Sequence, residues 1–295
     1  MNMDHKKNLL LGALLSLLSY FCVSSTNTLV KMINGRVDSL QILLLQYAFG
    51  WVIIFLICAF KQKKISFYKS EHFGLLFLRA LVGVGAFFFI FIAVQHMSVA
   101  NATLLFNTGP FFIPFLLFLF YKETIDHRLW FGIIPGFIGI AFILHPGASV
   151  FQWHAILPLI SGLCLAFIYL SLGRLHHYKE PTLRILFYLF LFATLMTLPF
   201  GIFYWQNPSS KDWILLALIA LTSFLAQTMI AFSLRYGSTK ALAPLCYTSV
   251  IFAILFDWIF WNDIPSWASI VGTALVMIGG ITAILIESKS IKTKL

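Results

Sequence analysis

Uninterrupted apolar runs, each about 20 residues long, recur along the whole chain and limit what it can fold into. Runs of this length suit helices that cross the hydrocarbon core of a bilayer, whereas a membrane β-barrel would show segments of about 10 residues with alternating polarity. Apolar residues make up 60% of the chain and charged residues 10%, against roughly 25% charged residues in soluble domains. The sequence therefore predicts an all-α integral membrane protein surrounded by a lipid bilayer.

Ten membrane spans can be drawn, and the loops between them are too short to hold a soluble domain. The first run is too long for the apolar core of a signal peptide, so we keep it as a span. The four cysteines lie in apolar runs without C-x-x-C spacing, so we expect no disulfide, no metal site and no cofactor. The predicted spans are residues 9–30, 40–60, 72–95, 99–120, 129–145, 154–173, 182–205, 212–234, 240–260 and 266–286.

The basic residues give a net charge of +10, but they are scattered through short loops. Sixteen Lys and Arg residues fall on one side of the predicted spans, and three, Lys31, Arg36 and Lys211, fall on the other. Cytoplasmic loops of membrane proteins carry the excess of Lys and Arg. We therefore expect both termini to be cytoplasmic, the protein to lie in the cell inner membrane, and no nucleic-acid partner.

Residues 98–139 resemble residues 238–279 when the chain is shifted by 140 positions without a gap. The match has eight identities, among them Thr108 with Thr248, and it sets Glu123 opposite Asp263 in equivalent loops. We interpret the chain as a five-span unit used twice, residues 1–146 and 147–295. Since five is odd, the second unit lies upside down relative to the first. The predicted fold is ten transmembrane helices as two inverted five-helix repeats, an arrangement typical of secondary transporters.

Two prolines occupy corresponding spans of the two halves, Pro110 in the fourth and Pro244 in the ninth. A proline removes a backbone donor and permits a kink, so one interpretation is a matched break in both halves. The alternative is that membrane helices simply tolerate these prolines.

With this span count, several short motifs make the chain resemble the EamA-like branch of the drug/metabolite transporter (DMT) superfamily. Asn27-Thr28-Leu29-Val30-Lys31 is similar to the N-x-x-x-K of that family, and Leu78-Arg79-Ala80 to its L-R-G. Residues 100–110, followed by Lys122-Glu123 and Gly132, are similar to its A-x-x-A…P…E…G signature, and the second half has Asp263 for the acid and no proline at position 250.

This resemblance implies a substrate cavity between the halves, lined mainly by the first, third, fourth, sixth, eighth and ninth spans. It also implies small-molecule substrates such as amino acids, nucleotide-like metabolites and amphipathic cations. In one place the chain departs from the family pattern. The second span often carries an early arginine, and here Gln46 puts an amide there, so we expect a less acidic substrate if that arginine binds anions in relatives.

Polar and charged residues inside the spans are the candidates for substrate binding. Arg79 is costly at membrane depth and is either functional or placed so that it reaches the cytoplasmic face. Asn27 belongs to a polar run of the first span, where cavity lining and interhelical hydrogen bonding are the alternatives. Polar residues at equivalent positions of the two halves would lie at the same depth and suit a binding site on the two-fold axis that relates the repeats. The remaining candidates are Asn107, Thr108, Tyr169, Gln227, Tyr247 and Thr248.

The predicted function is a secondary transporter that moves a small metabolite, an amino acid or an amphipathic or cationic compound, by alternating access. An importer or exchanger of a nucleotide-like metabolite such as S-adenosylmethionine is the alternative. Asp257 is the acidic residue that lies within a predicted span, so it is the candidate for coupling transport to protons. The alternative is exchange of the substrate against a counter-substrate. The oligomeric state is left open.

Two other classes of membrane protein are the alternatives. An embedded enzyme would need a catalytic or metal constellation, but the chain has no H-E-x-x-H, no G-x-S-x-G and no phosphate-binding loop, and His176 and His177 are direct neighbours. A channel would need a filter of carbonyl loops or charged rings, and neither is visible. Saturable, trans-stimulated uptake would separate a carrier from a channel.

Overall fold

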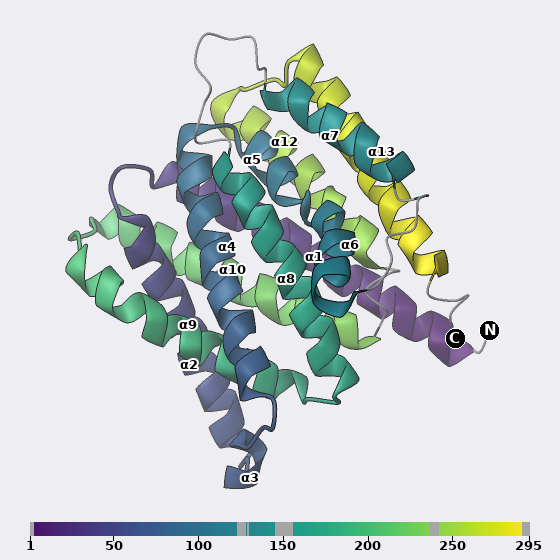
Figure 1. The fold of residues 1–295 in the computed structure, drawn as a ribbon. Helices are drawn as coiled ribbons and strands as arrows, with labels where there is room; N and C mark the ends of the chain where they lie inside the picture. The colour runs from purple at the N-terminus through teal and green to yellow at the C-terminus, as the bar shows by residue number, and fades with distance from the viewer. Residues whose placement is uncertain (1–2, 123–127, 129, 145–155, 237–241, 291–295) are drawn as a thin grey trace.

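The computed structural model describes residues 3–122, 128, 130–144, 156–236 and 242–290, and these residues form helices joined by short loops, without a β-strand among them. Glu123, Ser238 and the boundary predicted after residue 146 lie outside the described residues. In chain order the helices shown in Figure 1 are α1 (Met3–Met32), α2 (Ser39–Phe60), α3 (Ile65–Tyr68), α4 (Phe73–His96), α5 (Val99–Phe106), α6 (Gly109–Tyr121), α7 (Trp130–Leu144), α8 (Ile156–His177), α9 (Thr182–Phe203), α10 (Ser210–Tyr236), η3 (Ala243–Tyr247), α12 (Thr248–Trp261) and α13 (Trp267–Ser290).

Length and hydropathy identify seven of the described segments as long and apolar enough to cross a membrane. One of them, Val99–Phe120, combines α5 and α6, and three shorter apolar helices, Trp130–Ile140, Leu245–Trp261 and Trp267–Thr282, complete the set. The described part of the chain therefore has ten apolar segments at the positions of the ten predicted spans. The prediction of an all-α membrane protein is confirmed.

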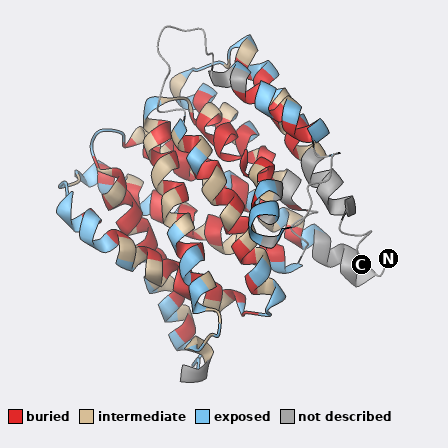
Figure 2. Ribbon diagram, in the orientation of Figure 1, coloured by how far each residue is buried: buried red, intermediate tan, exposed pale blue. Residues whose placement is uncertain are grey.

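Exposed residues lie along the outer faces of the helices (Figure 2), and many of them have large apolar side chains. Phe60 is 84% exposed, Phe131 76% and Phe203 80%. Soluble monomers rarely leave wide apolar surfaces in contact with water. This surface suits a protein whose helices face lipid, where the backbone polar groups are satisfied within each helix.

Two of the spans are broken at corresponding positions, as the prolines predicted. α5 ends at Phe106 and α6 begins at Gly109, with Pro110 in its first turn. In the second half the 3₁₀ helix η3 contains Pro244 and passes into α12 at Thr248. A proline cannot donate to the preceding turn, so each break leaves carbonyl groups that need other partners.

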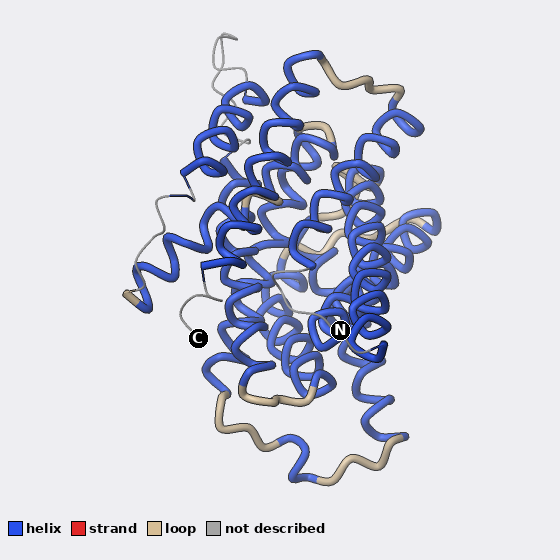
Figure 3. Tube along the Cα trace, turned by 90° about the vertical axis from the view of Figure 1, so that its right-hand side faces the viewer, coloured by secondary structure: helices blue, strands red, loops and turns tan. Residues whose placement is uncertain are grey.

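The helices, which Figure 3 shows from a second side, pack in pairs that connect distant parts of the sequence. α1 packs against α10, α4 against α8, α2 against α9, and α7 against α13. Among the broken helices, α12 contacts α1 and α5, and α5 and α6 contact α8. Figure 1 shows α7 and α13 as a pair at one edge of the bundle.

Glycines bring α7 and α13 close enough for backbone contact. A Cβ on Gly139 would lie 2.6 Å from the Gly272 carbonyl oxygen, and a Cβ on Gly279 would lie 2.5 Å from the Gly132 carbonyl oxygen. Small residues permit such an approach, which drives helix association in lipid through van der Waals packing. The two contacts are reciprocal, because the 140-residue shift pairs Gly139 with Gly279 and Gly132 with Gly272 and so turns the first contact into the second.

Replacing Gly279 with alanine is expected to lower the free energy of unfolding by about 1–3 kcal/mol, because the added methyl group overpacks a helix contact. The atoms it would meet, the Gly132 carbonyl oxygen and the Gly136 amide nitrogen at 2.8 Å, are backbone and cannot rotate away. Thermal unfolding in detergent measures the effect. Gly74→Ala in α4, where a Cβ meets no atom within 4 Å, is the matched control and should leave stability nearly unchanged, and an equal loss in both variants would contradict the packing explanation.

Candidate functional site

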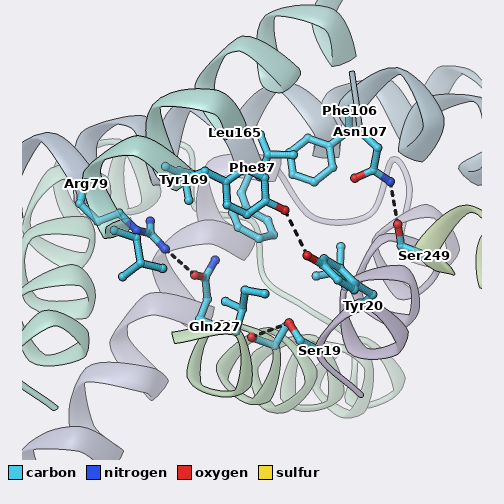
Figure 4. Close-up of a pocket in the computed structure, with 15 residues that line it drawn as sticks. Ser19, Tyr20, Arg79, Phe87, Phe106, Asn107, Leu165, Tyr169, Gln227 and Ser249 are labelled. Atoms are coloured by element: carbon cyan, nitrogen blue, oxygen red, sulfur yellow. Dashed lines mark hydrogen bonds between the residues drawn. The ribbon is translucent and has the colours of Figure 1, made fainter. Parts of the chain in front are cut away.

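A pocket lies at the centre of the bundle, between α1, α4, α5, α8, α10 and α12 (Figure 4). These are the segments to which the family resemblance assigned a substrate cavity. The cavity itself has a volume of about 50 Å³, and the unfilled space reaches about 560 Å³ only when its open side is included. Four of the residues predicted for a site line it, Arg79, Asn107, Tyr169 and Gln227.

Arg79 supplies the charge of the pocket. It lies six residues after the start of α4 at Phe73, which places it about 9 Å along the helix at a rise of ~1.5 Å per residue. Its side chain is nonetheless buried, at 2% exposure, and Nη2 donates a hydrogen bond to Oε1 of Gln227 at 2.9 Å. The guanidinium is therefore held inside the protein by α10 and does not extend to the surface.

Two tyrosines meet in the middle of the pocket. The hydroxyl groups of Tyr20 on α1 and Tyr169 on α8 are 3.2 Å apart and hydrogen-bonded, as Figure 4 shows. Both side chains are buried. The pair joins helices from the two halves of the chain, and its rings form part of the wall between Arg79 and the breaks.

Asn107 connects the two broken spans. Its Nδ2 donates to the Cys246 carbonyl oxygen at 3.2 Å and to Oγ of Ser249 at 2.7 Å. The Cys246 carbonyl lies in η3, so a side chain at the first break satisfies an acceptor at the second. Buried polar groups in proteins are nearly always hydrogen-bonded in this way. Asn107 and Ser249 form the end of the pocket nearest the breaks (Figure 4).

Apart from Ser19, the rest of the wall is apolar. Phe87 and Phe106 supply aromatic surface, and Leu165, Ile168 and Leu172 on α8 supply aliphatic surface. No acidic side chain is found among the described residues that line this pocket. A mostly apolar pocket with a few convergent polar groups is the usual form of a small-molecule site.

The other predicted binding residues lie beside the pocket and do not line it. Asn27 donates from Nδ2 to Oγ1 of Thr103 at 3.4 Å, so the structure shows its interhelical bond, although its Oδ1 has no partner. Thr108 and Thr248 donate to the carbonyl oxygens of Leu105 (2.7 Å) and Leu245 (2.6 Å). They occupy equivalent places at the two breaks, where they satisfy carbonyl groups of their own segments.

Tyr247, the counterpart of Asn107 in the 140-residue shift, takes a different direction. Its ring points toward α13, where its hydroxyl occupies the place that a Cβ on Gly280 would fill. That hydroxyl is buried and has no hydrogen-bond partner. The predicted symmetry of the polar pairs therefore holds for the two threonines and for the breaks, and the side chains at 107 and 247 differ.

Asp257 lies away from the pocket, near the end of the bundle formed by residues 33–38, 97–98, 204–209 and 262–266, which we call the Lys31 end. Its Oδ1 accepts from Nζ of Lys31 at 3.3 Å and from the Val99 amide at 3.2 Å, and its Oδ2 accepts from the Ala100 amide at 2.7 Å. Lys31 Nζ also lies 4.5 Å from the ring centre of Trp261. The carboxylate therefore joins α12, α1 and the N-terminus of α5, where the helix dipole favours negative charge.

Sequence reasoning missed Ser19, Tyr20 and Ser249 as pocket residues. One signal was present in α1, because Ser16, Ser19, Tyr20, Val23 and Asn27 recur at the three- and four-residue spacing of a single helix face. Ser16 and Ser19 bond to α10, through Oγ of Ser233 and the Ala226 carbonyl oxygen. This face is therefore the one that α1 turns toward the interior.

Comparison with known proteins gives consistent matches over nearly the whole chain. The model of the EamA-like transporter family matches twice, at residues 10–145 and 152–285. The pseudopaline exporter CntI of Pseudomonas aeruginosa strain UCBPP-PA14 is 26% identical over 90% of this chain and 93% of its own length. The S-adenosylmethionine uptake transporter of Rickettsia conorii is 22% identical (99% and 98%), and the riboflavin transporter of Vibrio cholerae is 24% identical (94% and 93%).

A solved crystal structure of a protein shares the fold. It superposes with a TM-score of 0.67 at 16% sequence identity, over 96% of this chain and 99% of that chain. The arrangement of helices described above is therefore one that an experimental structure also adopts.

Proposed function

The chain belongs to the EamA-like transporter family, and from this premise we propose that it is a secondary transporter of a small organic metabolite that works by alternating access. The observation that carries the proposal is the central pocket, which has polar groups inside and apolar walls and is enclosed by helices from both halves. Secondary transporters built from repeats bind their substrate between the helices of the two repeats.

The packing supports two inverted repeats, residues 1–146 and 147–295. A two-fold repeat relates each of the first five spans to the span five places later in the chain. Under this exchange, the packed pair α1–α10 becomes the pair α8–α4, which also packs together. In the pairs α2–α9 and α7–α13, the two helices exchange with each other. The family model matches each half once, and the glycine contacts between α7 and α13 are reciprocal. Two equivalent halves in opposite orientation can exchange conformations, which is the mechanical basis of alternating access.

The charge distribution supports an inner-membrane protein with both termini in the cytoplasm. In that orientation the Lys31 end faces away from the cytoplasm. The contacts of Asp257 close this end, and Arg79 lies toward the opposite end of α4. In the described conformation, the pocket would then lie on the cytoplasmic side of the contacts that Asp257 makes at the Lys31 end. These contacts would break when the pocket opens to the outside.

An enzyme is the less favoured function, because the relatives are transporters and no group of three or more His, Cys, Asp or Glu in the described residues could hold a metal ion. S-adenosylmethionine is the second candidate substrate. Its carboxylate would suit Arg79 and its adenine ring the aromatic wall, whereas its sulfonium would find no acidic partner among the described lining residues. Proton coupling through Asp257 remains a proposal beside exchange against a counter-substrate.

Purified protein is expected to show a raised thermal midpoint with a subset of metabolites, because a ligand that binds the folded state stabilises it by about 2.7 kcal/mol at a hundredfold excess over Kd. A compound that does so should enter proteoliposomes with saturable kinetics, and preloading with the same compound should accelerate its entry. Liposomes without protein are the control. Uptake that rises linearly with concentration and ignores preloading would indicate a channel and contradict the proposal.

A further inference from the structure

We propose that the central pocket binds a monocarboxylate with an aromatic or apolar body, and that Arg79 holds the carboxylate. This inference deepens the proposed function, on which it rests, by naming the chemical class of the substrate.

Arg79 has more donors than the protein has acceptors for it. Its Nη2 donates to Gln227, but Nε and Nη1 are buried and have no hydrogen-bond partner. A guanidinium is always charged and carries five N–H donors. None of the ion pairs among the described residues includes Arg79. A buried charge without a counter-ion is costly, and a buried ionisable group inside a membrane span marks a functional site by default.

The surroundings hold the guanidinium in place. Gln227 fixes one nitrogen from α10, and Gly83, one turn along α4, leaves room for another, since a Cβ there would lie 3.0 Å from Nη1. Tyr47 on α2 donates to the Gly83 carbonyl oxygen at 3.2 Å and so supports this turn. Figure 4 shows the side chain reaching from α4 toward Gln227 at the edge of the pocket. Arg79 is thus prepared for an anion that the protein itself does not supply.

The charge balance selects a single negative charge. One guanidinium neutralises a monocarboxylate, whereas a phosphate dianion would bring a second charge into an apolar space without a partner. An ammonium group would be repelled by Arg79 and would meet no acid among the described lining residues. Cationic metabolites are therefore the least suited class, and free amino acids should bind less tightly than the corresponding acids without an amino group.

The walls select the body of the ligand. Phe87, Phe106 and the rings of Tyr20 and Tyr169 line the pocket between Arg79 and the Asn107 end (Figure 4). Leu165 and Ile168 add aliphatic surface. Aromatic rings favour offset or edge-to-face packing with other rings. The two tyrosine hydroxyls offer a polar contact to a ring substituent.

The test uses four acids, 3-phenylpropanoate, 3-(4-hydroxyphenyl)propanoate, indole-3-acetate and octanoate, each beside its carboxamide, with L-phenylalanine added for comparison. Binding is measured by calorimetry and thermal shift on the full chain in lipid nanodiscs. We expect at least one acid to bind at least tenfold more tightly than its carboxamide and than L-phenylalanine. If no acid exceeds its carboxamide, the inference is overturned.

The variants assign the preference to Arg79. Arg79→Gln should abolish the difference between acid and carboxamide, and Arg79→Lys should keep part of it. Arg36→Gln, at the half-exposed arginine that pairs with Asp212, is the matched control and should keep all of it. An acid preference that survives in Arg79→Gln would overturn the role of this residue.

A measurement on the unmodified protein covers the case in which Arg79→Gln does not fold. Phenylglyoxal should modify Arg79, the bound acid should protect it and the carboxamide should not, as read by peptide mass spectrometry. Labelling that the acid does not reduce, or no labelling of Arg79 in the free protein, would count against the inference. Acid binding without trans-stimulated uptake would support this site and contradict the transporter, whereas saturable uptake of other compounds without any acid preference would do the reverse.

Discussion

Replacing Asp257 with asparagine is expected to lower the free energy of unfolding by about 3 kcal/mol, because it breaks a buried ion pair at one partner. The carboxylate accepts from three donors through its two oxygens, and the amide has a single oxygen. At least one of Lys31, the Val99 amide and the Ala100 amide would lose its acceptor. The Asp257 side chain is 3% exposed and that of Lys31 17%, so the pair is largely removed from bulk water. Unfolding in detergent measures the loss, and uptake into proteoliposomes should fall with it.

Asp212→Asn is the matched control, because Asp212 also pairs with a basic residue of the Lys31 end. Its partner Arg36 has a side chain that is 50% exposed, so water can solvate the guanidinium once the charge of the partner is gone. We expect a clearly smaller loss. The double variant Lys31→Met with Asp257→Asn should be more stable than the sum of the single effects, since it leaves no uncompensated lysine. Equal losses at the two aspartates would contradict a special role for Asp257.

The sequence was sufficient for the number of membrane segments and for the positions at which two of them break. Length and hydropathy determine the first, and Pro110 and Pro244 indicated the second because proline cannot continue a helix's hydrogen bonds. Arg79 could be selected as well, since a charge inside a span is rare and costly. These features depend on single residues or on composition, so they can be predicted without knowing how the helices pack.

The direction in which each side chain points could not be predicted. In a soluble helix the polar face marks the outside, but lipid is as apolar as a protein interior, so the rotation of a membrane helix leaves a weak signal. Tyr247 was expected in the pocket and packs against Gly280, whereas Tyr20 was not selected and meets Tyr169 there. Asn27 likewise turned out to bond to Thr103. In each case the contact depends on a neighbouring helix that is distant in sequence.

Changing Asn107 to aspartate is expected to have the other large effect. The two side chains have nearly the same shape, but the amide nitrogen of Asn107 donates to the Cys246 carbonyl oxygen and to Oγ of Ser249. A carboxylate would place a negative oxygen against that carbonyl, in a site where Asn107 is 1% exposed. The Cys246 carbonyl oxygen would keep the bond from Oγ of Ser249 at 2.6 Å and lose the one from residue 107, at a cost of about 0.5–1.5 kcal/mol, and the buried charge adds to this cost. Because the bond joins the two breaks, saturable uptake should be lost even where folded protein can still be purified.

Asn34→Asp tests whether burial is the cause. Asn34 also donates from its amide nitrogen to a backbone carbonyl, that of Gln95 at 3.1 Å, but it is exposed at the Lys31 end. Water can satisfy the carbonyl there, so we expect nearly unchanged stability and uptake. Asn107→Leu separates the two contributions at the buried site, since it removes the donor without adding a charge, and its stability should lie between that of the unmodified protein and Asn107→Asp. If Asn107→Asp transports as well as Asn34→Asp, the link between the two breaks is not required for the movement of the halves.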